Sequence, residues 1–193
     1  MADAATAVRV AIDLLQMPSR ARTIRQSPLP DGMALLLRVA ATEPAATAEA
    51  AALTGRTSDV VFQASVFFVE QVLLAPGTDS YRVLGASPQS SSADLRRNMA
   101  LLVRWLHPDV KQSTDRASFV NRVTVAWDDL KTAERRAAYD RTLGAGQNSR
   151  SGPGAKNAGK AAKSRSGSGN QFNPERVSLF RRALQLLLNR GRQ

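Results

Sequence analysis

Apolar side chains recur every three or four residues along most of this chain, which is the spacing of one face of an α-helix. The pattern predicts helices over residues 4–16, 32–41, 44–54 and 58–74, with a connector from Pro18 to Pro30. The last of these segments is apolar nearly all round, so we expect it to be a buried central helix. Residues 1–77 are therefore predicted to form a small helical domain of unknown function.

Helix-end residues mark the boundaries of the same segments. Pro44 takes the first position of one helix and Gly55 ends it, and Thr57 or Ser58 can cap the next. Pro76 and Gly77 then stop the helical pattern.

A helical hairpin is predicted in residues 78–143. A short helix around Tyr81–Leu84 precedes a long helix over about 93–106, which Pro108 must end because proline lacks the backbone N–H. A second long helix over about 116–131 and a short one over about 133–141 follow. Two amphipathic helices joined by a short loop pack antiparallel, so the chain as a whole is predicted to be all-α.

The composition changes after residue 143. Residues 144–171 are rich in Gly, Ser, Lys, Ala and Asn and should form a flexible linker, because they cannot bury enough apolar surface to order themselves. Within residues 172–193, the pattern predicts an amphipathic helix over about 174–190, begun by Asn173 and Pro174. Its apolar face is too wide to stay in water, so it should dock on a protein or a membrane surface.

Charge and residue usage exclude several classes of functional site. The net charge is +11, of which residues 144–193 contribute +9, so the basicity belongs mostly to the tail. The absence of cysteine excludes disulfides and thiolate metal sites, and a single histidine excludes a histidine-rich metal site. We therefore expect neither a metal nor another cofactor. No nucleotide-binding glycine loop or catalytic triad is present, so we expect the chain not to be an enzyme.

Four short motifs occur in order within residues 79–143. They are Tyr81-Arg82-Val83-Leu84-Gly85, His107-Pro108-Asp109, Ala126-Trp127 with Leu130, and Arg136-Ala137-Ala138-Tyr139-Asp140. Each is weak alone, but their order and spacing together are specific. This region resembles the J domain of DnaJ-like co-chaperones. The second helix differs from the family's usual basic and tyrosine positions at Met99, Ala100, Leu101 and Trp105.

The resemblance implies a partner and a binding site. Members of the family bind a DnaK-class ATPase through the His-Pro-Asp loop and stimulate its ATP hydrolysis, which gives this role to His107, Pro108 and Asp109. Arg96, Arg97 and Arg104 on the preceding helix either bind the partner or are only a solvated face. The residues expected in the domain core are Tyr81, Leu84, Leu95, Met99, Leu102, Val123, Ala126, Trp127, Leu130 and Tyr139.

Two other classes of function stay open. The basic tail could bind nucleic acid, although no aromatic residue lies between Gly144 and Gln171 to stack on bases. The helix over 174–190 could instead lie on a membrane surface, although its narrow polar face fits protein docking better. We find no convincing targeting segment and expect a cytoplasmic protein. The client, the chaperone paralogue and the oligomeric state cannot be inferred from these patterns.

Overall fold

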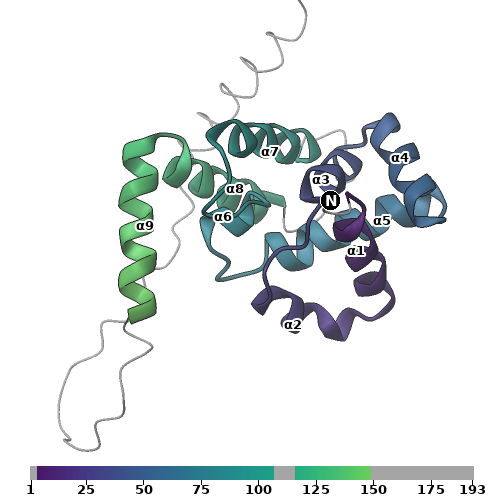
Figure 1. The fold of residues 1–193 in the computed structure, drawn as a ribbon, viewed down its shortest axis with the longest axis horizontal. Helices are drawn as coiled ribbons and strands as arrows, with labels where there is room; N and C mark the ends of the chain where they lie inside the picture. Colours follow the sequence, from purple (N-terminus) through teal and green to yellow (C-terminus); the bar gives the residue numbers. More distant parts are fainter. Residues whose placement is uncertain (1–3, 107–115, 149–193) are drawn as a thin grey trace, which may run out of the picture.

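The computed structural model of the chain describes residues 4–106 and 116–148, and these residues form helices and turns without a strand (Figure 1). The predicted all-α class is therefore confirmed for this part of the chain. Most of the predicted linker and all of the predicted tail helix lie outside the described residues, so both stay predictions.

Four helices of the N-terminal segment follow the apolar pattern. They are α1 (Thr6–Gln16), α3 (Met33–Ala40), α4 (Pro44–Thr54) and α5 (Ser58–Phe68). Helix α5 packs against the other three, as expected for a helix with apolar residues on nearly all sides. Thr57 caps its start, because the Thr57 side chain accepts a hydrogen bond from the backbone N–H of Val60. The helix continues into a π-helical turn, η2 (Val69–Leu73).

The predicted connector is partly helical, which the sequence pattern did not indicate. Pro18–Arg20 form a 3-10 turn, η1, and Ala21–Gln26 form the short helix α2. A helix this short has no periodic signal of its own, and none of its residues is fully buried. A tertiary contact anchors it instead, because Nε of Arg25 donates to the backbone carbonyl of Gln71 at 2.6 Å.

The second half of the structure contains α6 (Ser80–Val83), α7 (Ser92–Trp105), α8 (Arg116–Leu130) and α9 (Ala133–Asn148). Figure 1 shows α6, α7 and α8 between the N-terminal helices and α9. Helix α9 runs past the predicted end at residue 141 and beyond Gly144. No proline interrupts it before Pro153, and Leu143 still packs against the core.

One hydrophobic core runs through both halves of the described chain. It includes Leu36, Leu37 and Phe68 from the N-terminal helices and Leu84 and Leu102 from α6–α7, all almost fully buried. Helix α3 packs directly on α7. The N-terminal helices and the hairpin are therefore joined by apolar packing.

Two arginines add polar contacts across this junction. Arg82 on α6 donates to the backbone carbonyls of Ile24 at 2.6 Å and Ser27 at 2.8 Å, at the end of α2. Burial lowers the pKa of the Arg82 guanidinium, and these carbonyls replace part of the water that it has lost. On α8, Arg122 donates to the backbone carbonyl of Leu74, at the end of the π-helical turn.

Gly85 lies at a close approach of the two halves. Its φ is +60°, and a Cβ placed there would lie 3.1 Å from Cδ1 of Leu37, which is 1% exposed. Gly55 has a similar φ of +65°, but a Cβ there would meet nothing within 4 Å. The two glycines thus share one backbone constraint and differ in packing.

We expect Gly85→Ala to lower the free energy of unfolding more than Gly55→Ala does. Both variants bear the cost of a left-handed alanine, about 1–2 kcal/mol, and Gly85→Ala adds roughly 1–3 kcal/mol of overpacking against Leu37. Urea denaturation of the full chain measures both values. Equal losses would show that α3 does not pack on this turn.

Candidate functional site

The first and last sequence motifs meet between α6 and α9. The Tyr81 hydroxyl donates to a carboxylate oxygen of Asp140 at 2.7 Å and accepts from Nε of Arg136 at 2.9 Å. The Arg136 guanidinium also lies over the Tyr81 ring, 5.3 Å from its centroid. Burial, followed by the hydrogen bond to Asp140, raises the pKa of the Tyr81 hydroxyl above its usual range. Both motifs therefore fix the position of α9.

A second set of contacts closes the same junction. The Tyr139 hydroxyl accepts from the backbone N–H of Ser80 at 2.7 Å, and the rings of Tyr81 and Tyr139 meet edge to face with centroids 5.9 Å apart. The Ser80 hydroxyl donates to Asp129 on α8 at 2.7 Å. Helix α6 is thus joined by hydrogen bonds to both α8 and α9.

Asn98 holds the other end of α6. Its side-chain amide is buried and donates to the carbonyls of Leu84 at 3.0 Å and Gly85 at 3.2 Å. These carbonyls lie at the end of a helix, where no intrahelical partner remains for them. The Asn98 side chain therefore fixes where α7 crosses α6.

The residues expected in the core lie at or near it. Eight are buried, namely Tyr81, Leu84, Leu95, Met99, Leu102, Val123, Ala126 and Leu130, whereas Trp127 and Tyr139 are half-buried and pack against the core.

Helix α7 presents a narrow exposed face made almost wholly of arginine. Between residues 95 and 106, the exposed residues are Arg96, Arg97, Ala100 and Arg104. The residues that differ from the family's usual basic pattern are mostly inside, because Met99 and Trp105 are buried and Leu101 is half-buried. The exposed face thus keeps its basic character with one neutral position at Ala100.

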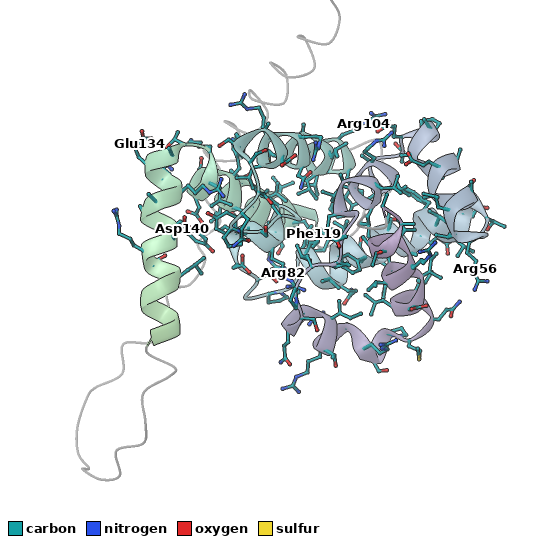
Figure 2. The ribbon with its side chains drawn as sticks, in the orientation of Figure 1. Arg56, Arg82, Arg104, Phe119, Glu134 and Asp140 are labelled. Atoms are coloured by element: carbon teal, nitrogen blue, oxygen red, sulfur yellow. The ribbon has the colours of Figure 1, made fainter. Side chains whose placement is uncertain are left out.

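The start of this face has an acidic neighbour. At its start, Arg97 pairs with Asp94 at 2.7 Å. Asp94 also completes a capping box with Ser91, and the Ser91 hydroxyl, followed by the Arg97 charge, holds the pKa of the Asp94 carboxyl below its usual range. At the far end, Arg104 lies on the side of α7 that faces α3 and α4 (Figure 2).

His107, Pro108 and Asp109 follow directly after α7 but lie outside the described residues. Their expected role in partner binding stays a prediction. The described part of the site is the arginine face that leads to them.

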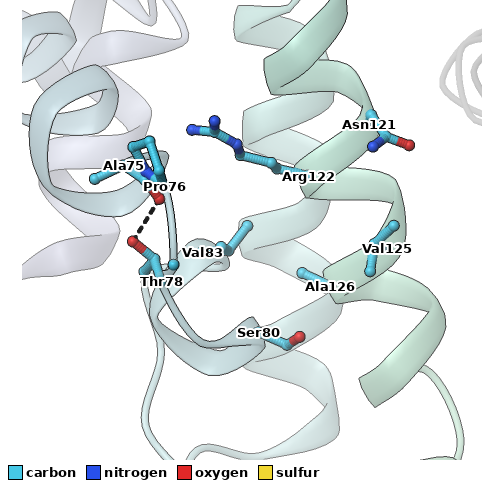
Figure 3. A pocket seen from close by; sticks show the side chains of 10 residues that line it. Ala75, Pro76, Thr78, Ser80, Val83, Asn121, Arg122, Val125 and Ala126 are labelled. Carbon is cyan, nitrogen blue, oxygen red and sulfur yellow. Dashed lines mark hydrogen bonds between the residues drawn. The ribbon is translucent and has the colours of Figure 1, made fainter. Parts of the chain in front are cut away.

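An open groove of about 300 Å³ lies elsewhere, between the turn at residues 75–78 and α8 (Figure 3). Arg122, Asn121 and Val125 line its α8 side, and the Thr78 hydroxyl donates to the carbonyl of Ala75 on the opposite side. No group of three His, Asp or Glu side chains able to hold a metal occurs among the described residues. Within the same residues, no helix is long and apolar enough to cross a membrane.

The motif contacts agree with a comparison of the sequence with protein families. Residues 79–140 match the family model described as the DnaJ domain. This segment is a DnaJ domain. In the DnaJ domain, α6 carries the first motif, α7 leads to the His-Pro-Asp sequence, α8 carries Ala126-Trp127, and α9 carries the last motif.

Curated relatives match over the same region. The chain is 38% identical over 63 residues to the chaperone protein DnaJ of Rickettsia prowazekii, covering 33% of this chain and 17% of that protein. It is 40% identical over 61 residues to the chaperone protein DnaJ of Rickettsia africae, covering 32% and 16%. The match thus spans less than a fifth of these relatives' length. No solved structure matches the chain.

Sequence reasoning missed two polar features of the DnaJ domain. Asn98 lies between Leu95 and Leu102 on the apolar face of α7, so its burial could have been inferred from helical spacing. Arg82 gave no such signal, because its partners lie more than fifty residues away on α2.

We expect Tyr81→Phe and Tyr139→Phe each to lower the free energy of unfolding by about 1 kcal/mol, because each removes a hydroxyl that joins α6 to α9. The wild type should also lose stability relative to Tyr81→Phe as the pH rises above about 10, the ordinary tyrosine pKa. The raised folded-state pKa means that folding favours the neutral hydroxyl, so its contribution is complete below that pH and is lost above it. Urea denaturation across this pH range measures both effects, and parallel curves for the two proteins would contradict the second.

Proposed function

We propose that this protein binds a DnaK-class ATPase through its DnaJ domain and stimulates ATP hydrolysis by that partner. The observation that carries the proposal is the DnaJ-domain match at residues 79–140, with all four motifs present in order. The name shared by the relatives, chaperone protein DnaJ, points to the same role in protein folding.

The exposed face of α7 supports a physical route for this binding. Arg96, Arg97 and Arg104 offer positive charge to an acidic partner surface, which speeds encounter more than it strengthens the final complex. Asp109 then accepts a charge-assisted hydrogen bond from an arginine of the partner, a bond about twice as strong as a neutral one.

In this proposal, Pro108 keeps the shape of the loop and His107 supports it by packing or hydrogen bonding. ATP hydrolysis takes place in the partner, so the chain itself acts as a co-chaperone and not as an enzyme. Residues 1–77 or 172–193 would select the client or the place of action.

The alternative is an adaptor that uses the tail for nucleic acid or a membrane surface and carries a DnaJ domain that does not stimulate. Its support is the charge of +9 in residues 144–193, all but a few of which lie outside the described residues. Nucleic-acid binding of this kind would weaken steeply with added salt, because it depends on released counterions.

His107→Gln and Asp109→Asn should each abolish stimulation of a purified bacterial DnaK by the full chain. Neither substitution adds or removes much volume, so circular dichroism and the melting temperature should stay close to the wild-type values. Asp13→Asn, an exposed substitution on α1, is the matched control and should stimulate normally. Equal stimulation by wild type and both loop variants would contradict the proposal.

Ala100→Lys should speed association with DnaK about two- to fivefold at low salt, because it completes the exposed arginine face. The gain should vanish in about 0.5 M salt, where screening is strong. Ala100→Glu occupies the same exposed position and should slow association. Stopped-flow measurements across a salt series test both signs, and identical rates for the two variants would place the docking surface elsewhere.

A further inference from the structure

The corner between α3 and α4 is an unusually fixed piece of backbone. Thr42 has a φ of +59°, a left-handed conformation that a β-branched residue rarely adopts. The turn is closed by hydrogen bonds from the backbone N–H of Thr42 to the carbonyl of Val39 and from that of Glu43 to the carbonyl of Arg38. This is the Schellman pattern, in which the left-handed position usually belongs to glycine.

Side chains hold the same corner in place. Arg38 donates to the two carboxylate oxygens of Glu43 at 3.0 and 2.8 Å and to Glu49 on α4 at 3.4 Å. All three side chains are between 31% and 46% exposed, so they contribute to the surface. One guanidinium thus orders two carboxylates, and the corner keeps a net charge of −1.

This acidic corner borders the arginine face of α7. Helix α3 packs on α7, and Figure 2 shows Arg104 at the end of α7 that faces α3 and α4. The hydrogen bonds from Arg38, together with the charges of Arg38 and Arg104, hold the pKa of the Glu43 carboxyl below its usual range. Arg104 is therefore close enough to contribute to the electrostatic environment of the Glu43 carboxyl.

The charges divide unequally along the face. At its start, Arg96, Arg97 and Asp94 together have a net charge of +1. At its end, the charge of Arg104 and the net charge of −1 at the corner sum to zero. The formal charges therefore balance at the end of the face that precedes the sequence His107-Pro108-Asp109.

We propose that Glu43 and Glu49, held by Arg38, limit how fast a DnaK-class partner docks by cancelling the charge of Arg104. This inference rests on the proposed function and adds a regulating element from outside the DnaJ domain. An acidic partner surface would be attracted to the start of α7 and only weakly to its end. The N-terminal helices thereby reduce the pull of the arginine face on such a surface.

The test measures association of the full chain with purified DnaK for Glu49→Gln and Glu43→Gln. Each should associate about twofold faster at low salt, since each removes one negative charge from the corner that borders the arginine face, and the gain should be lost in about 0.5 M salt. Asp13→Asn removes the same charge from the exposed face of α1 and should leave the rate unchanged.

Glu49→Gln is the decisive variant, because Glu49 makes only one long hydrogen bond at the corner whereas Glu43 also forms the turn. Its melting temperature should match that of the wild type. If the wild type stimulates DnaK and Glu49→Gln associates no faster than Asp13→Asn, the inference is wrong and the proposed function stands. If the wild type neither binds nor stimulates DnaK, both are wrong.

Discussion

The packing of α3 against α7 and against the turn after α6 is the contact on which the other features depend. Leu37 lies beside Gly85, and a Cβ at residue 85 would come within 3.1 Å of Cδ1 of Leu37. Once α3 occupies this position, Arg82 can reach the end of α2 and the α3–α4 corner lies beside Arg104. The shared core therefore places N-terminal polar groups beside the DnaJ domain as well as stabilising both parts.

Local pattern was sufficient to predict most of the helices. Pro44, Gly55 and Thr57 have the positions expected of them, and the apolar spacing of α7 and α8 gave the hairpin core. The exceptions are α2, where Arg25 contacts Gln71, and the extension of α9, where Leu143 packs against the core. In both cases the structure contains a tertiary contact that no window of neighbouring residues shows.

The candidate site was predictable only where a motif carried it. The motif residues Tyr81, Arg136 and Tyr139 form one connected network, but their hydrogen bonds could not be read from their spacing. The corner formed by Glu43 and Glu49 gave no signal, because no sequence rule relates it to Arg104 some sixty residues later. Partner binding by His107, Pro108 and Asp109 stays a prediction from the motif.

The composition of α7 follows from the two surfaces that it must pack against, namely α3 and the rest of the hairpin. A helix that packs on α3 and also carries the hairpin core must bury residues over a wide arc, and Asn98, Val103 and Trp105 are buried in addition to the core positions Leu95, Met99 and Leu102. Only a narrow arc then stays in water, and arginine fills three of its four positions from residue 95 onward. Arginine suits so narrow a face, because its guanidinium stays charged at every physiological pH and offers several donors. The joining of the two halves thus concentrates the charge of α7 into a single row and places the end of that row beside the carboxylates of the α3–α4 corner.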